Sequence, residues 1–341
     1  MDRTYKYTVC TRCFTYNHAP YIWDALDGFV AQQTDFPVVY TIVDDASTDG
    51  EPQLLRNYFN ENFEADDSKI AYKEEMDYGS VLFGQHRVNR NCFFALILLR
   101  DNHYSKKRSK LPYISRWQDN AKYIALCEGD DYWVDSFKLK KQADYMNEHP
   151  ECSMCAHAAF WKTGNDIRKR GCAHGVECDL TTDEVIRHGG YYLATASLFF
   201  KSDLVHLRPE WRIKANVGDF PLQILGSLNG TLHFFPEAMC VYRYMVEGSF
   251  SIRNKVFSSA YLAKKIEWMR LLNEDTRSTY SKAIYFNLYN TCYRQLYRDH
   301  HVSFFTLLSV YLKSDRKVYN LKSLVDAVRA ARLISRNKDS N

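Results

Sequence analysis

Three carboxylates fall within four consecutive positions, Glu128, Gly129, Asp130 and Asp131, directly after the apolar run 123–127. A short apolar run of this kind predicts a buried strand, so we expect the acidic residues at a strand end. Carboxylates this close raise each other's pKa unless a cation or hydrogen-bond donors offset their charge. Oxygen ligands at such a place suit Mg²⁺ or Mn²⁺, held together with the phosphates of a substrate. The alternative is an acidic surface turn.

A second acidic segment, residues 44–50, follows another apolar run. Residues 38–43 are rich in β-branched side chains without alternation, which is typical of a strand covered on both faces. Upstream, a predicted strand at 8–11 is followed by Pro20 and by apolar residues at helical spacing: Ile22, Leu26, Phe29 and Val30. The chain therefore begins as strand, helix, strand, helix, with polar residues at the carboxyl ends of the strands. In an open α/β sheet, ligands bind at that edge.

These segments resemble, in the same order, the motifs of glycosyltransferase family 2, whose members have the GT-A fold and use nucleotide sugars. The matching residues are Thr15-Tyr16-Asn17, Gln32-Gln33-Thr34, 43–50, 128–133, Lys138-Leu139-x-Lys141-Gln142 and Gly218-Asp219-Phe220-Pro221. The resemblance covers residues 5–250. It departs from the family at Glu128, where aspartate is commonest, and at 101–120, which looks like an insertion.

The resemblance implies an α/β fold of the GT-A type, with a mixed, mostly parallel sheet flanked by helices over residues 1–252. A helical C-terminal appendage is expected over 253–341. Within the pattern, residues 90–100 are predicted as a largely buried helix, 101–118 as a basic surface loop and 136–148 as an amphipathic helix. The alternative for the basic loop is a contact with an acceptor phosphate or a membrane.

The resemblance also implies which residues bind the donor. Asp45 matches the position that accepts a hydrogen bond from the base, typically uracil. Glu128 would meet the ribose or the outer shell of the metal, and Arg90 matches a diphosphate contact loosely. The remaining wall of the base pocket is expected from Phe14, Thr15 and Tyr16. An alternative for Asp45, with Ser47 and Asp49, is an Asx-turn or helix cap before Glu51.

The resemblance also implies which residues bind the metal and which one is the general base. Asp130 is expected to bind Mn²⁺ or Mg²⁺ directly, while Asp131 either binds the ion or only buttresses the loop. The metal would neutralise charge on the leaving diphosphate. Asp219 is expected to take the proton from the acceptor hydroxyl. The alternative for Asp219 is a helix cap before Pro221.

The function implied is transfer of a hexose-type sugar from a nucleoside diphosphate donor, expected to be a UDP-sugar, to a hydroxyl of a glycan or lipid-linked acceptor. One base without a second paired carboxylate suits a single displacement with inversion, in the assembly of a bacterial surface polysaccharide. Two alternatives belong to other classes. A nucleotidyltransferase needs a glycine-rich phosphate loop after the first strand. Residues 10–17 contain no glycine, which counts against this class. A non-catalytic glycan-binding relative would not need Asp45, Asp130 and Asp219, so the presence of all three argues against that class.

Composition agrees with such an enzyme. The formal net charge of +4 over 341 residues implies no nucleic-acid partner. The beginning of the chain lacks an apolar signal region, and no apolar stretch reaches the ~18 residues that span a bilayer. Ten cysteines in this setting predict reduced thiols and a cytoplasmic protein. The alternative use of some of these cysteines is a zinc site formed by Cys152, Cys155, Cys172 and Cys178.

The region after residue 255 is predicted to be helical, with tyrosine-rich segments and a basic, amphipathic end. Such a tail can lie on an anionic membrane surface, which would place the protein at the inner face of the membrane. Alternatively, the helices pack on the catalytic domain and expose their basic face to solvent.

Overall fold

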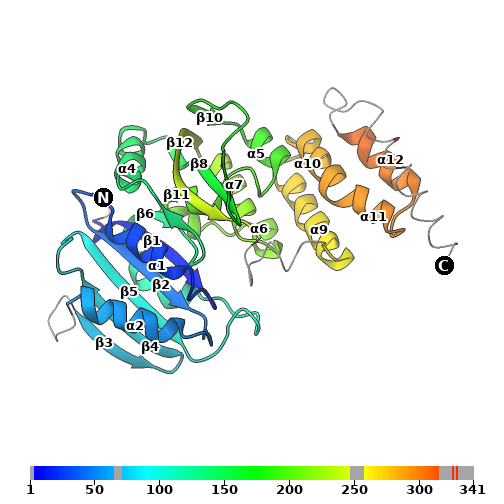
Figure 1. Cartoon of the computed structure of the whole chain (residues 1–341). Coiled ribbons are helices and arrows are strands. Elements are labelled where there is room, and N and C mark those ends of the chain that lie inside the picture. The colour runs from blue at the N-terminus through cyan, green and yellow to red at the C-terminus, as the bar shows by residue number, and fades with distance from the viewer. Residues whose placement is uncertain (1–3, 65–70, 246–256, 315–324, 326–327, 329–341) are drawn as a thin grey trace. The chain divides into compact units, whose positions relative to one another are not determined.

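The computed structural model describes residues 4–64, 71–245, 257–314, 325 and 328, and Figure 1 traces them from the N-terminus to the C-terminus. The chain forms two compact units. The first comprises Met1–Asp179, Leu193–His206 and Gly230–Arg253, and the second comprises Leu180–Tyr192, Leu207–Asn229 and Asn254–Asn341. The segments 180–192 and 207–229 thus belong to the second unit. The predicted domain boundary between residues 252 and 253 stays a prediction.

The first unit contains one mixed sheet with the strand order β10-β12-β8-β11-β6-β1-β2-β5-β4-β3, in which β7 pairs with β12 and β9 with β8. The strands are β1 (Tyr7–Thr15), β2 (Val38–Asp44), β3 (Tyr72–Met76), β4 (Gly79–Gln85), β5 (Cys92–Leu99), β6 (Ala121–Leu126), β7 (Tyr132–Trp133), β8 (Cys152–Thr163), β9 (Asp166–Arg170), β10 (Cys178–Leu180), β11 (Phe199–Lys201) and β12 (Thr231–Arg243).

The four central strands, β6, β1, β2 and β5, run parallel. Thr15 stands opposite Asp44, so β1 and β2 end at the same level. Antiparallel strands flank this centre, with β11 on β6 and β4 on β5. The parallel centre gathers the polar strand ends at one edge, as the sequence predicts.

Helices cover both faces of the parallel centre. Alternate residues of β2 belong to two different cores, because successive strand residues point to opposite faces. Tyr40 and Ile42 pack with α1 (Ile22–Val30), α2 (Glu51–Asn62) and α4 (Lys138–Glu148). On the other face, Val39 and Val43 pack with Ile114 and Trp117 of α3 (Leu111–Gln118).

The prediction of a helix at residues 90–100 is wrong, because this segment forms β5. An uninterrupted apolar run does not distinguish a buried helix from a strand covered on both faces. Here the backbone of 92–98 pairs with β2, and both faces are covered by the two cores. Helix α3 likewise occupies the end of the segment 101–118, which was predicted as a loop. The amphipathic helix at 136–148 is confirmed as α4.

The second unit is helical. Its helices are α5 (Thr182–His188), α6 (Glu210–Lys214), α7 (Asp219–Leu228), α9 (Ser259–Asp275), α10 (Ser281–Leu288), the π-helical turn Tyr289–Tyr293, α11 (Arg294–Arg298) and α12 (Phe304–Lys313). The Asn287 side chain donates to the Ile186 carbonyl at 2.8 Å, and Trp211 Nε1 donates to Asp275 at 2.9 Å. These contacts tie α5 and α6 to the C-terminal helices.

The predicted basic tail beyond residue 314 lies almost wholly outside the described residues. In the part of the chain that the structure describes, no helix is both long and apolar enough to cross a membrane.

Candidate functional site

The turns after β2 and β6 are both hydrogen-bonded to the end of β1. Asp45 N donates to the Thr15 carbonyl at 3.0 Å, and Gly129 N donates to the Phe14 carbonyl at 3.1 Å. The structure therefore brings together the three strand ends that the sequence predicts to form a site. Phe14 is partly exposed there, and Tyr16 is 36% exposed.

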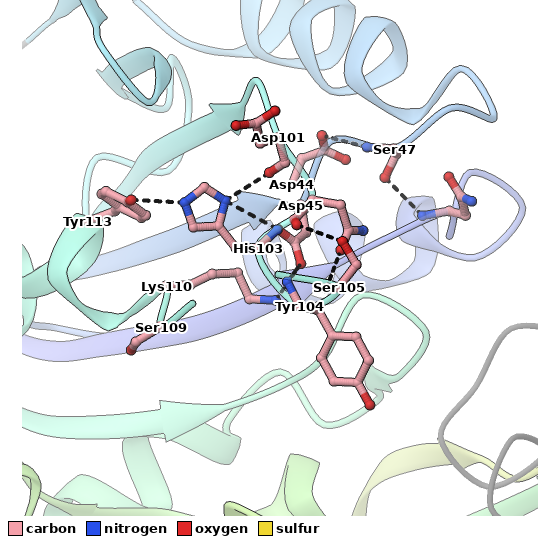
Figure 2. A network of polar contacts seen from close by, with 12 residues as sticks. Asp44, Asp45, Ser47, Asp101, His103, Tyr104, Ser105, Ser109, Lys110 and Tyr113 are labelled. Carbon is pink, nitrogen blue, oxygen red and sulfur yellow. Dashed lines mark hydrogen bonds and ion pairs between the residues drawn. The ribbon is translucent and has the colours of Figure 1, made fainter. Parts of the chain in front are cut away.

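Asp45 is the centre of a polar network that sequence reasoning missed. Its side chain is fully buried, and its carboxylate accepts three hydrogen bonds from the segment 103–110. His103 N lies 2.6 Å from Oδ1, Tyr104 N lies 3.0 Å from Oδ2, and Lys110 Nζ lies 2.9 Å from Oδ2. Figure 2 shows these donors around Asp45, with the Tyr104 ring pointing away from them. The predicted base acceptor is thus already paired within the protein.

The imidazole of His103 fixes the two backbone amides. Its Nδ1 lies 2.8 Å from the Asp101 carbonyl, which can only accept, so Nδ1 carries a proton. In the neutral ring Nε2 then accepts from the Tyr113 hydroxyl at 2.9 Å (Figure 2). Because both ring nitrogens are engaged, the amides of the segment stay directed at Asp45 independently of Lys110.

Lys110 links Asp45 to the rest of the predicted donor pocket. Its ammonium lies 5.1 Å from the centre of the Phe14 ring, and its side chain is only 14% exposed. Its charge also acts to lower the pKa of Glu128. Lys110 therefore lies among three residues predicted to bind the donor. The only sequence signal for it was the basic run 105–110, which was interpreted as a surface loop.

Lys110→Met is expected to lower the free energy of unfolding by about 1.5–3 kcal/mol, the usual worth of a hydrogen bond to a charged group. The loss leaves the buried Asp45 carboxylate with its two amide donors and without the ammonium of Lys110. Denaturant unfolding measures the effect, and Asp45→Asn in the same chain should restore part of it. A Lys110→Met protein as stable as the wild type would show that the ion pair contributes nothing.

Arg90 lies away from this cluster. It precedes β5, which runs parallel to β2, so it lies at the amino edge of the sheet, opposite the strand ends that form the site. There its guanidinium pairs with Glu64 Oε1 at 2.5 Å. The predicted diphosphate contact through Arg90 therefore finds no support in the geometry.

A second polar network lies under the loop after β1 and centres on Glu51, the first residue of α2. The Glu51 carboxylate accepts from the Thr15 hydroxyl, from His18 N at 2.9 Å and from the Ser47 hydroxyl at 2.9 Å. Asp49 accepts from Glu51 N at 3.1 Å and from Ala19 N at 2.9 Å. The bond from Glu51 N fits the Asx-turn alternative for Asp49. The bonds from Asn17 N to Ser47 and from Ala19 N to Asp49 hold the two loops together.

The residues Glu128, Gly129, Asp130 and Asp131 form the predicted metal motif, called the metal motif below, and two of its carboxylates have a raised pKa. Burial first, and then the charge of Asp130, raise the pKa of Glu128 to about 7, while Lys110 and Arg12 act in the opposite direction. The same two causes raise the pKa of Asp131 well above its usual range. A divalent cation would offset this concentration of negative charge. The carboxylates therefore suit a hard metal ion.

The two aspartates of the motif differ in their surroundings. Asp131 is buried, and its Oδ1 accepts from Arg243 N at 2.8 Å. Arg243 also donates to the Asp130 carbonyl at 2.7 Å and pairs with Asp24. This geometry favours the buttressing alternative for Asp131. The Asp130 side chain is 16% exposed and lies 4.0 Å from His18 Nε2, which leaves its carboxylate available for an ion.

In the described ranges, no three His, Cys, Asp or Glu side chains are grouped so that they could hold a metal ion. A site made wholly of protein side chains is not required for Mg²⁺ or a similar ion, because such ions are commonly bound by one or two carboxylates together with substrate phosphates. Asp130 fits that mode of binding.

Gly129 allows the metal motif to approach the β1 loop. A Cβ added there would lie 2.2 Å from Thr15 Oγ1 and 3.0 Å from His18 Nδ1. Gly129→Ala is therefore expected to lower stability by about 1–3 kcal/mol through overpacking, and to weaken binding of UDP with metal. Thermal melting and calorimetry measure the two effects. Gly218→Ala, whose new Cβ meets no atom within 4 Å, is the matched control for melting, and equal losses in both variants would refute the steric explanation.

Asp219 belongs to the second unit. It is the first residue of α7, and Gly218 rather than Asp219 is the N-cap residue. The Oδ1 atom of Asp219 accepts a hydrogen bond from Phe220 N at 2.8 Å. The helix-cap alternative is therefore not supported in its predicted form, and the role of Asp219 as general base stays a prediction.

The cysteines of the predicted zinc cluster are free thiols, as are the other six. Cys152 and Cys155 are buried in β8, whereas Cys172 and Cys178 lie 3.9 Å apart between their sulfur atoms. Within the residues that the structure describes, these cysteines form no metal-binding group. The reduced, cytoplasmic setting of these thiols stays a prediction.

Comparison with known sequences identifies relatives without an assigned function. No family model matches the chain. The uncharacterized proteins Rv1520 of Mycobacterium tuberculosis and Mb1547 of Mycobacterium bovis are each 30% identical over 263 residues, which cover 74% of this chain. The chain spans 62% of the length of these relatives.

Comparison with solved structures identifies the fold. S. aureus TarS 1–349 in complex with UDP-GlcNAc superimposes with a TM-score of 0.57 and 14% identity, over 85% of this chain and 75% of that one. The same protein in complex with UDP superimposes with a TM-score of 0.53 and 14% identity, over 87% of this chain and 75% of that one. This likeness shows the fold, and it confirms the expected α/β architecture of the GT-A type. Membership of glycosyltransferase family 2 stays a prediction.

Proposed function

We propose that this protein is a glycosyltransferase that moves a sugar from a nucleoside diphosphate donor, a UDP-sugar in the simplest case, to a hydroxyl acceptor. The observation that carries the proposal is the convergence of Asp45, Glu128 and Asp130 on the end of β1, through the hydrogen bonds from Asp45 N and Gly129 N. The fold that holds them is shared with TarS, which was solved with UDP-GlcNAc.

The donor would lie across the carboxyl ends of β1, β2 and β6. Phe14 and Tyr16 would provide the apolar wall, with Thr15 beneath them, and Glu128 would meet the ribose. Asp45 would accept an N–H of the base once Lys110 gives up its hydrogen bond. The amides of His103 and Tyr104 keep the carboxylate in place during that exchange.

Asp130 would hold Mn²⁺ or Mg²⁺, with Asp131 supporting the turn from behind. When bound, the ion neutralises charge on the diphosphate as it leaves. Asp219 would remove the proton from the acceptor hydroxyl as that oxygen attacks the anomeric carbon. A single displacement of this kind inverts the configuration at the anomeric carbon. The acceptor would be a glycan or a lipid-linked sugar in surface polysaccharide assembly at the cytoplasmic side of the membrane.

Binding and turnover of a UDP-sugar test this function. Calorimetry with UDP should show binding that strengthens when Mn²⁺ is present. UDP release from UDP-sugars, with water as the weaker acceptor, should need the metal and fall in chelator. A protein that binds neither UDP nor another nucleoside diphosphate, with or without metal, would contradict the proposal.

A further inference from the structure

His18 lies beside the metal motif without having been predicted there. Its Nε2 lies 4.0 Å from Asp130 Oδ2, and the two side chains are only 12% and 16% exposed. A separation of 4.0 Å is too long for a hydrogen bond. It is close to twice the ~2.1 Å length of a bond from a small divalent metal to nitrogen or oxygen. One ion can therefore reach both atoms.

The hydrogen bonds on the other side of the ring decide where the imidazole proton lies. The Thr15 hydroxyl has one proton, and it donates that proton to Glu51 Oε1. His18 Nδ1, 3.2 Å from the same hydroxyl oxygen, can therefore bind it only as a donor. In the neutral ring the proton is thus on Nδ1, and Nε2, the nitrogen that lies 4.0 Å from Asp130 Oδ2, then carries the lone pair.

This arrangement is the one found around metal-binding histidines. A ligating imidazole almost always donates its other N–H to a carboxylate, a carbonyl or water, which fixes its tautomer and orientation. Here the Thr15 hydroxyl, itself bonded to the Glu51 carboxylate, stands in the place of that group, and Glu51 also accepts from the backbone N of His18. Gly129 keeps the ring close to the metal motif, because any side chain there would collide with Thr15.

We propose that His18 is a second protein ligand of the divalent ion, through Nε2, beside Asp130. The inference rests on the proposed function and adds a nitrogen ligand to its metal site. Imidazole suits transition-metal ions, whereas Mg²⁺ prefers oxygen. The site therefore favours Mn²⁺ over Mg²⁺, and His18 is the residue that sets this preference.

His18→Asn is the sharpest variant, because the asparagine amide can keep the hydrogen bond to Thr15 while the Nε2 position is lost. The full chain would be titrated with Mn²⁺ in the presence of UDP, and the free ion measured by its electron paramagnetic resonance signal. His206→Asn is the matched control, since that ring is 55% exposed and pairs with Asp119. Spin-echo modulation would show whether ¹⁴N is bound directly to the Mn²⁺.

We expect ¹⁴N modulation in the wild type and in His206→Asn, and none in His18→Asn. The Mn²⁺ affinity of His18→Asn should fall by at least ~10–100-fold, the loss usual for removing only an outer-shell partner of a ligand. The Mg²⁺ affinity should change less, so the preference for Mn²⁺ is lost. Bound Mn²⁺ without directly coordinated nitrogen in the wild type would overturn the inference. So would unchanged Mn²⁺ affinity in His18→Asn, the result expected if a protonated His18 merely pairs with Asp130.

The failure of the inference can be told apart from that of the proposed function. If the wild type binds Mn²⁺ with UDP and Asp130→Asn does not, the metal site stands, and the ¹⁴N signal alone decides on His18. If the wild type binds no UDP in either condition, the proposed function itself falls.

Discussion

Asp130→Asn is expected to abolish metal-dependent binding of UDP and to lower turnover by at least ~10²–10³-fold. A bound metal lowers the activation free energy of such a transfer by several kcal/mol, and this contribution is lost with the ion. Asparagine has nearly the same shape as aspartate, and among the described residues His18 Nε2 lies 4.0 Å from the Asp130 carboxylate, too far for a hydrogen bond that the substitution could break. The substitution also removes a charge that raises the pKa of Glu128 and Asp131. The melting temperature should therefore stay the same or rise slightly.

Calorimetry with UDP and Mn²⁺, UDP release and thermal melting measure these effects together. Asp35→Asn is the matched control, because that carboxylate lies on the surface and is 72% exposed. Asp130→Asn with full activity in chelator and unchanged melting would remove Asp130 from the metal site. Reduced activity with a much lower melting temperature would instead indicate a structural role.

Asp219→Asn is expected to lower turnover by ~10²–10⁴-fold, the range for losing a positioned general base. Donor binding should survive, because the residues that would make it belong to the first unit. Stability should barely change, since the asparagine oxygen can still accept from Phe220 N, the bond that Oδ1 accepts in the structure. Steady-state kinetics with UDP-sugar and calorimetry with UDP separate the two effects.

Asp219→Ala distinguishes a catalytic from a structural role at the start of α7. It should lose turnover as Asp219→Asn does, and it should also lose up to ~1 kcal/mol of stability with the hydrogen bond to Phe220 N. If Asp219→Asn transfers sugar at the wild-type rate, Asp219 has no part in the chemistry. A loss shared by turnover and UDP affinity would indicate a disturbed fold.

The strand ends were predictable because their signals are local. Residues 38–43 and 123–127 are apolar runs that stop at acidic turns. In the structure they lie in or directly after β2 and β6, the parallel strands on either side of β1. Helix α4 was predictable for the same reason, since its amphipathic pattern is contained in one segment. The segment 92–99 was not, because a run that is apolar throughout carries no period that separates a strand from a helix.

The sequence by itself determined which residue types stand at the carboxyl edge of the sheet, and with them the chemistry that the site can support. Only the tertiary structure decided their partners. Lys110 reaches Asp45 from 65 positions away, and Arg243 N reaches Asp131 from 112. His18 Nδ1 contacts the Thr15 hydroxyl, which donates to Glu51, and His18 Nε2 lies 4.0 Å from the Asp130 carboxylate on another loop. Such pairings depend on how distant segments pack, and no local pattern of apolar and polar residues encodes them.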